Sequence, residues 1–229
     1  MTKVFINGFG RIGRTVLRAW AQGGWPEVEI VGINDIAEAD LCSHLFEYDS
    51  VFGPFNGEVH LDGKTLHVNG RAIPMSQTPD VSTLDLTGID LVMECTGKAD
   101  GRDVAGRPLK AGARRVLISG PSAAADATIV IGANGSDLAD QQIISNASCT
   151  TNALAPLVRL LDDTWGVRTG WMTTIHCYTG SQPTIDAPRG DMMRSRAAAL
   201  SMVPTTTSAM RLLDHVLPDI AGRIEGAAV

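Results

Sequence analysis

The stretch Gly8-Phe9-Gly10-Arg11-Ile12-Gly13 decides the fold of this 229-residue chain. A short apolar strand, Val4–Ile6, precedes it, and apolar residues at helical spacing follow it. In a strand–turn–helix unit that binds a dinucleotide, the three glycines have separate tasks. Gly8 permits the tight turn, Gly10 lets the backbone approach a pyrophosphate, and Gly13 lets the helix pack closely on the strand. The stretch therefore predicts a dinucleotide-binding turn at the start of a helix.

A carboxylate lies where such a turn requires one. Asp35 follows a second apolar run, Val28–Ile33, about 20 residues beyond the turn. At the end of a second strand it would bond the 2′-hydroxyl of the adenosine ribose, and its charge would repel a 2′-phosphate. Asp35 therefore favours NAD over NADP as the cofactor.

Short apolar runs recur along the chain and alternate with polar or helix-period segments. Buried parallel strands have this pattern, so we expect an α/β fold with a doubly wound parallel sheet. The expected strands are Val4–Asn7, Val28–Ile33, Leu91–Glu94, Val116–Ser119 and Thr128–Ile131. The segment Phe55–Ile73 differs, because Asp62-Gly63 and Asn69-Gly70 predict two or three hairpin strands inserted at one edge.

The pattern changes near Asn146, where we place a domain boundary. Beyond it we expect a helix at Leu154–Leu161, an alternating strand at Trp171–His176 and the start of a strand at Ile224–Val229. Pro156 fits the expected helix only in its first turn or at a kink.

Composition restricts the class of protein. Hydrophobic residues make up 44% and charged residues 19% of the chain, and the mean hydropathy is +0.07, so we expect a packed core. The net charge of −6, with both signs interspersed, argues against nucleic acid or an anionic membrane as partner. No apolar stretch approaches the roughly 20 residues of a membrane span, and the N-terminus runs directly into a strand instead of a signal peptide. Four cysteines without paired or zinc-like spacing predict a cytoplasmic protein with free thiols and no metal site.

One cysteine has a distinctive setting. Cys149 lies within Ser145-Asn146-Ala147-Ser148-Cys149-Thr150-Thr151-Asn152, between a short strand, Ile143-Ile144, and a helix. A thiol at a helix N-terminus faces unpaired N–H groups and the positive end of the helix dipole, which favour thiolate over thiol. We therefore expect Cys149 to be a nucleophile.

His176 is the natural general base for this thiol, since it ends the alternating strand among hydroxyl side chains. A cysteine–histidine pair leaves two chemistries open, hydrolysis and oxidation through a thioester. The dinucleotide signature decides for oxidation, because a hydrolase does not need a hydride acceptor.

Several motifs together resemble glyceraldehyde-3-phosphate dehydrogenase of the phosphorylating type, over essentially the whole chain. They are Gly8–Arg14, Asn34-Asp35, Glu47–Val51, Cys95–Gly97, Ser145–Asn152, Thr173–His176 and Arg194–Ala199. The resemblance implies a Rossmann-type NAD-binding domain at residues 1–147, followed by part of an α+β catalytic domain at residues 148–229. It also implies a glycolytic enzyme whose substrates are a phosphorylated aldehyde and inorganic phosphate.

The resemblance further implies a mechanism. Cys149 attacks the aldehyde to form a thiohemiacetal, His176 takes the hydroxyl proton as hydride passes to the nicotinamide, and phosphate cleaves the resulting thioester. The residues implied for the substrate and phosphate sites are Ser148, Cys149, Thr150, Thr179, Thr207 and Ser208. Those implied for the cofactor are Gly8, Gly10, Arg11, Ile12, Gly13, Asp35, Thr96, Gly97 and Ser119, with Arg11 and Ile12 acting through their backbone.

Two further expectations follow from the resemblance. The loop Arg189–Arg196 reaches a neighbouring subunit in the resembled family, which predicts a homotetramer. The family continues beyond Val229 with further groups of the active site, so we expect a truncated chain whose own activity is weak or absent. Two rival functions stay open: a sister enzyme that oxidises erythrose 4-phosphate or uses arsenate, and a nucleotide-binding or oligomerisation fragment without catalysis.

Overall fold

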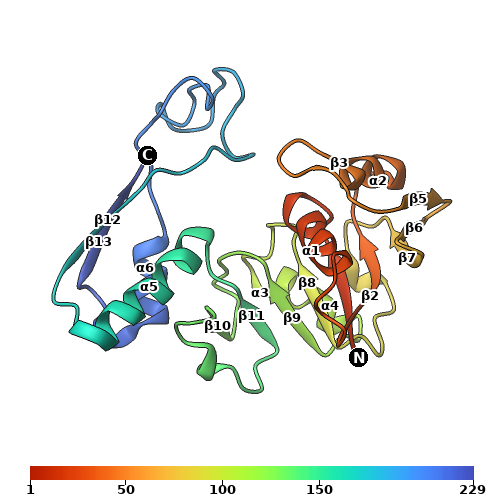
Figure 1. Ribbon diagram of the computed structural model, residues 1–229, viewed down its shortest axis with the longest axis horizontal. Coiled ribbons are helices and arrows are strands. Elements are labelled where there is room, and N and C mark those ends of the chain that lie inside the picture. The colour runs from red at the N-terminus through yellow and green to blue at the C-terminus, as the bar shows by residue number, and fades with distance from the viewer. The chain divides into compact units, whose positions relative to one another are not determined.

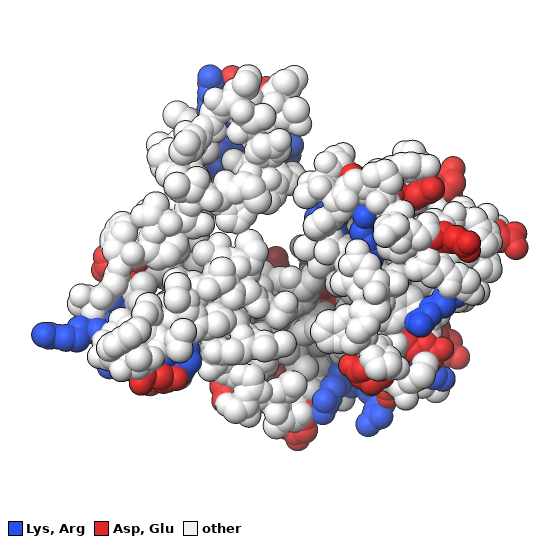
Figure 2. All heavy atoms as spheres, viewed as in Figure 1, with Lys and Arg blue, Asp and Glu red and all other residues white.

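The computed structural model describes residues 1–229 and divides into two compact units. Unit 1 comprises Met1–Thr128 and Leu138–Asn146, and unit 2 comprises Ile129–Asp137 and Ala147–Val229. None of the helices combines the length and the hydrophobicity that a membrane crossing requires. Figure 2 shows Lys and Arg side chains interspersed with Asp and Glu side chains over the visible surface.

A nine-stranded sheet is the main element of unit 1 (Figure 1), with the order β10-β11-β9-β8-β1-β2-β7-β6-β5. All neighbours from β10 to β7 pair in parallel. These strands are β1 (Thr2–Asn7), β2 (Val28–Asn34), β7 (Arg71–Ser76), β8 (Leu91–Glu94), β9 (Arg115–Ile118), β10 (Ala127–Thr128) and β11 (Ile143–Ser145). The α-helices of unit 1 are α1 (Arg11–Ala21), α2 (Ala39–Glu47), α3 (Arg102–Ala105) and α4 (Arg107–Lys110), and β3 (Tyr48–Asp49) pairs with β4 (Gly53–Pro54). This arrangement confirms the predicted α/β fold class.

One face of α1 packs into the main core of unit 1. Leu17 and Trp20 are buried three positions apart on the helix, and Gly13 lies one turn before them. They join strand residues such as Ile6 and Ile33, which are fully buried. The helix that carries the glycine turn is therefore fixed to the sheet by its apolar face.

The inserted strands lie at one edge of the sheet, as the sequence predicts. β5 (Val59–Asp62), β6 (Thr65–Val68) and β7 form an antiparallel meander. Asn69 (φ 49°) and Gly70 (φ 76°) have the positive φ values of the two-residue turn that joins antiparallel strands. β7 then pairs in parallel with β2, so the hairpins extend the sheet without entering its centre.

The strand expected at Thr128–Ile131 is wrong beyond its first residue. β10 ends at Thr128, and the chain turns through Gly132, whose φ is 83°. The physical reason is packing. Val130 is fully buried in the core of unit 2, and its N–H donates to Asn134 Oδ1 (2.8 Å).

Unit 2 contains two α-helices and one pair of strands (Figure 1). α5 (Cys149–Trp165) packs against α6 (Ala209–Val216), and β12 (Gly170–Thr174) pairs in parallel with β13 (Ile224–Ala228). α5 is longer at both ends than the predicted helix and continues through Pro156. β12 is shorter than its prediction, because it ends two residues before His176. Three short 3₁₀ helices complete the chain: Val81–Thr83 in unit 1, and Gly135–Asp137 and Pro218–Ile220 in unit 2.

Candidate active site

Cys149 is the first residue of α5. The side chain of Ser148 caps the helix by accepting a hydrogen bond from Thr151 N (3.1 Å). Ala147, just before the cap, has a left-handed φ of 54° and begins the turn into the helix. The thiol is exposed at the positive end of a 17-residue helix.

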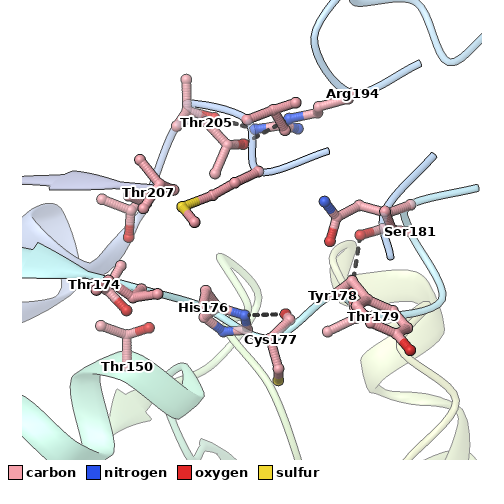
Figure 3. A pocket seen from close by; sticks show the side chains of 18 of the residues that line it. Thr150, Thr174, His176, Cys177, Tyr178, Thr179, Ser181, Arg194, Thr205 and Thr207 are labelled. Carbon is pink, nitrogen blue, oxygen red and sulfur yellow. Dashed lines mark hydrogen bonds between the residues drawn. The ribbon is translucent and has the colours of Figure 1, made fainter. Parts of the chain in front are cut away.

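His176 faces this thiol. Cys149 Sγ and His176 Nε2 are 3.3 Å apart, and His176 Nδ1 lies 2.6 Å from the carbonyl oxygen of Cys177 (Figure 3). Because a carbonyl oxygen only accepts, Nδ1 carries a proton, which leaves Nε2 to exchange a proton with the sulfur. The strand pair also holds the histidine backbone, since His176 N donates to Val229 O (2.8 Å).

Each member of the pair shifts the pKa of the other. The hydrogen bond with His176 lowers the pKa of Cys149 below its ordinary value, with smaller contributions from the N–H and hydroxyl groups of Thr150, although partial burial opposes the shift. The same bond raises the pKa of His176, and a backbone carbonyl adds to that rise. Both directions favour a thiolate beside an imidazolium, which is an activated nucleophile with its acid–base partner in place.

Two other thiols lack this activation. Burial raises the pKa of Cys42 to about 11 and the pKa of Cys95 to about 12, so both are protonated at neutral pH. Reactive cysteines require thiolate character and access to solvent. Nowhere do three or more His, Cys, Asp or Glu side chains come together in a way that could hold a metal ion.

Cys149 and His176 line a pocket of about 670 Å³ within unit 2. Hydroxyl groups dominate the rest of its polar lining (Figure 3): Ser148, Thr150, Thr174, Tyr178, Thr179, Ser181, Ser201, Thr205, Thr206, Thr207 and Ser208. They come from the start of α5, from the end of β12 and the loop after it, and from the segment before α6. Hydroxyl and N–H donors of this kind bind oxyanions.

The structure brings together every residue that the sequence predicts for catalysis, substrate and phosphate. Ser148, Cys149, Thr150, His176, Thr179, Thr207 and Ser208 all line this pocket. Thr179 Oγ1 lies 3.0 Å from Ser181 Oγ, so the loop after β12 presents two hydroxyls side by side. Ser208 is the N-cap residue directly before α6, and its side chain makes no capping hydrogen bond.

Arg194 is a lining residue that sequence reasoning missed. It is the only Lys or Arg side chain in the pocket wall. Its Nε donates to Thr205 Oγ1 (2.9 Å) and its Nη2 donates to Thr206 Oγ1, which holds the guanidinium among the hydroxyls (Figure 3). Arg194 opens one of the motifs quoted above, but the charges around it are also typical of a solvated loop.

In unit 1 the glycine turn has the geometry that its sequence predicts. Gly8 has a φ of 94°, and a Cβ there would lie 2.7 Å from backbone atoms of Cys95 and Thr96. A Cβ on Gly13 would lie 2.1 Å from the carbonyl oxygen of Gly8. A Cβ on Gly10 would meet nothing within 4 Å, so the backbone there is open to a ligand.

The N-terminus of α1 is suited to a pyrophosphate. Gly10 is its N-cap residue, and no side chain caps the helix. The guanidinium of Arg11 pairs with Asp49 (2.5 Å), which leaves the backbone N–H of Arg11 as the group at the helix end. Ile12 is half-exposed beside it. Uncapped N–H groups and the helix dipole together fit the NAD that the sequence predicts.

Asp35 lies directly after β2, beside the glycine turn. One carboxylate oxygen accepts from Phe9 N (2.6 Å) and the other from Ala37 N (2.8 Å). The acid predicted for the ribose therefore also holds the turn. The remaining predicted cofactor residues follow strands of the same parallel sheet: Thr96 and Gly97 after β8, and Ser119 after β9.

Three buried polar residues at these strand ends were not predicted as site residues. Asn7, Asn34 and Glu94 are 5%, 3% and 2% exposed. Each is the last residue of its strand. A polar residue that ends each of three apolar strands is the signal that could have identified them.

Comparisons with known proteins point to one family. Two family models match the chain, one described as "Glyceraldehyde 3-phosphate dehydrogenase, NAD binding domain" over residues 2–102, the other as "Glyceraldehyde 3-phosphate dehydrogenase, C-terminal domain" over residues 148–229. The protein named glyceraldehyde-3-phosphate dehydrogenase of Xanthobacter flavus is 46% identical over 230 residues, which cover 99% of this chain and 69% of that protein. Glyceraldehyde-3-phosphate dehydrogenase 1 of Bacillus subtilis is 46% identical, and the Cereibacter sphaeroides protein named glyceraldehyde-3-phosphate dehydrogenase is 45% identical. Each of these two alignments covers 99% of this chain and 68% of the relative.

Proposed function

Because the chain belongs to the glyceraldehyde-3-phosphate dehydrogenase family, we propose that Cys149 and His176 are the catalytic pair of an NAD-dependent oxidoreductase. Its substrates are a phosphorylated aldehyde, D-glyceraldehyde 3-phosphate, and inorganic phosphate. The observation that carries this assignment is the 3.3 Å contact between Cys149 Sγ and His176 Nε2 in a hydroxyl-lined pocket.

The pair carries out both the covalent step and the proton transfers. The Cys149 thiolate attacks the aldehyde carbon, and His176 Nε2 donates its proton to the oxygen, which gives a thiohemiacetal. His176 then removes that hydroxyl proton as the carbon loses its hydrogen and the thioester forms. When bound, NAD supplies the acceptor for this hydride. A phosphate oxygen attacks the thioester carbon and releases the thiolate, which leaves 1,3-bisphosphoglycerate.

The pocket provides donors for two phosphate groups. We assign Thr179 to the substrate's own phosphate. The attacking phosphate would be held by Ser148, Thr150, Thr207 and Ser208. Arg194 joins this second group on the ground of its position, since a guanidinium fixed among hydroxyls binds an oxyanion strongly.

Unit 1 supplies the cofactor site in this proposal, and we assign residues 1–147 to the NAD-binding domain and residues 148–229 to the catalytic domain. The open N-terminus of α1 and the uncrowded Gly10 support binding of the pyrophosphate. The assigned residues are Gly8, Gly10, Arg11, Ile12, Gly13, Asp35, Thr96, Gly97 and Ser119.

We also propose that the protein assembles as a homotetramer in the cytoplasm. The loop Arg189–Arg196 exposes Met192, which is 93% accessible, and the neighbouring Met193. Exposed methionines suit an adaptable protein interface. Four free cysteines suit a reducing compartment.

The catalytic proposal is tested by NADH formation from glyceraldehyde 3-phosphate, NAD and phosphate. We expect Cys149→Ser to abolish the reaction and His176→Asn to slow it by about 10²–10⁴-fold, the usual contribution of a general acid–base group. Cys42→Ala and His60→Asn change the same residue types outside the pocket and serve as controls. Full activity of Cys149→Ser would contradict the proposal. Parallel assays with erythrose 4-phosphate and with arsenate identify the preferred substrate and anion.

Alkylation by iodoacetamide separates an enzyme from a nucleotide-binding fragment. The labelling rate of Cys149, measured by mass spectrometry against pH, should rise with a midpoint below that of an ordinary thiol. In His176→Asn the midpoint should move to higher pH, because the stabilising imidazolium is gone. NAD binding without NADH formation, together with slow labelling of Cys149, would favour the fragment without catalysis.

A further inference from the structure

Three neighbouring strands of unit 1 end in polar residues at the same level of the sheet. Asn7 ends β1, Asn34 ends β2 and Glu94 ends β8. In the strand register, Asn7 is paired with Asn34 on one side and with Glu94 on the other. All three are nearly inaccessible to solvent. They form a polar row between the apolar core and the loops that follow these strands.

The side chains of this row form one continuous chain of hydrogen bonds. Asn34 Nδ2 donates to Asn7 Oδ1 (2.8 Å), and Asn7 Nδ2 donates to Glu94 Oε2 (2.5 Å). At one end, Glu94 Oε1 accepts from Thr96 N (2.9 Å) and from the Thr96 hydroxyl. At the other end, Asn34 bonds both backbone groups of Thr78, because its Oδ1 accepts from Thr78 N (3.1 Å) and its Nδ2 donates to Thr78 O (3.0 Å).

The chain has a direction, which Glu94 sets at one end and the backbone of Thr78 sets at the other. Both carboxyl oxygens of Glu94 accept hydrogen bonds, so Asn7 turns its N–H₂ group toward Glu94 and its oxygen toward Asn34. The backbone of Thr78 orients Asn34 in the matching sense, so that its N–H₂ group meets the oxygen of Asn7. If one of these buried amides were reversed, two N–H donors would face each other without an acceptor, which would destabilise the fold.

The loops attached to this row are those of the proposed cofactor site. Gly8 begins the glycine turn directly after Asn7, and Asp35 directly follows Asn34. Glu94 holds the Thr96–Gly97 loop by accepting hydrogen bonds from the N–H and the hydroxyl of Thr96. A fixed row therefore determines the relative positions of three loops that must contact one ligand together.

We propose that Glu94 is a positioning residue for NAD binding, which acts by orienting Asn7 toward Asn34 and by holding Thr96. It does not touch the cofactor in this role. The role rests on the proposed function, since it requires that unit 1 binds NAD.

The test exchanges the carboxylate and the amide within the row. In Glu94→Gln, an N–H₂ group replaces one acceptor, and every arrangement of the three amides then leaves donor facing donor at one link. In Asn7→Asp, two carboxylates lie in contact. The double variant Asn7→Asp/Glu94→Gln satisfies every link again. The new amide at position 94 donates to one oxygen of the new carboxylate at position 7, and Asn34 donates to the other oxygen.

Calorimetric titration of NAD into each variant of the whole chain gives the decisive result. We expect each single variant to bind NAD about tenfold more weakly, as one unsatisfied buried group would cause, and the double variant to return to within about twofold of the original chain. The alkylation rate of Cys149 should stay unchanged in all three, since that thiol lies in unit 2. Asp126→Asn is a matched control. It changes a carboxylate directly before β10 that accepts from Ile143 N and Gln142 N and pairs with Arg102, and it should leave the Kd for NAD unchanged.

Different results overturn different statements. If the unaltered chain does not bind NAD, the proposed function fails. If it binds NAD and Glu94→Gln binds equally well, or if the double variant is as weak as the single ones, the positioning role is wrong. A fall in Tm with an unchanged Kd would likewise show that the row only stabilises the fold.

Discussion

Replacing Gly13 with alanine should displace the start of α1. The new Cβ would lie 2.1 Å from the carbonyl oxygen of Gly8, whereas real Cβ atoms essentially never approach another heavy atom closer than 3.0 Å. The two groups must therefore separate by about 0.9 Å, the difference between these distances. Gly8 has little room to move, because the backbone of Cys95 and Thr96 lies against it. The first turn of α1 must move away from the sheet instead.

The energetic result combines two opposing effects. Overpacking of this kind costs about 1–3 kcal/mol, and an alanine in place of a helical glycine contributes about 0.5–1 kcal/mol of stability. The net expectation is a loss of up to about 2.5 kcal/mol in the free energy of unfolding. The same movement carries the N–H groups of Arg11 and Ile12 away from the pyrophosphate, so we expect NAD to bind roughly tenfold more weakly, equal to about 1.4 kcal/mol.

Urea unfolding and calorimetric NAD titration measure the two effects separately. Gly10→Ala is the matched control, because its Cβ meets no protein atom within 4 Å and its φ of −71° suits any residue. We expect Gly10→Ala to keep the free energy of unfolding and to weaken NAD binding, since its methyl group would occupy space on the ligand side. If Gly13→Ala unfolds at the same urea concentration as the original chain and binds NAD equally well, the assigned role of Gly13 is refuted.

Two further predictions concern carboxylates of unit 1. Bonds from Phe52 N–H, Val51 N–H and Arg11 lower the pKa of Asp49 to about 2, against 3.8 for a free side chain. This stabilisation is therefore complete above about pH 4 and is lost as the pH falls toward 2. Asp49→Asn should lower the resistance of the chain to urea at neutral pH and have little effect near pH 2. An equal loss at both pH values would argue against a role for the Asp49 charge. Asp35→Asn keeps an acceptor for Phe9 N–H but removes the charge that repels a 2′-phosphate. The ratio of the Kd for NADP to that for NAD should fall by about tenfold, and an unchanged ratio would assign the cofactor preference to other residues.

The sequence predicted most accurately the features that local chemistry determines. The glycine turn, the helix after Cys149 and the hairpin turn at Asn69-Gly70 each depend on residues within a few positions of one another. The errors concern features that depend on distant partners. Val130 reads as a strand residue, but the core of unit 2 buries it in a turn. Arg194 reads as part of a charged loop, but Thr205 and Thr206, more than ten positions away, hold it in the pocket wall.

The same distinction applies to the activation of Cys149. From the sequence, the start of a helix is the first reason to expect a thiolate, with His176 as its partner, and the structure has that helix. Yet the largest influence on the thiol pKa is the hydrogen bond with His176, while the backbone N–H of Thr150 at the helix start contributes less. The pH profile of alkylation therefore measures both effects. In His176→Asn, the lowering of the Cys149 pKa that remains is due to the helix N-terminus. The part that disappears is due to the hydrogen bond with His176, which forms only when the fold brings the start of α5 and the segment after β12 together. If His176→Asn leaves the pH profile unchanged, the helix N-terminus alone lowers the pKa of Cys149, and His176 does not help to form the nucleophile.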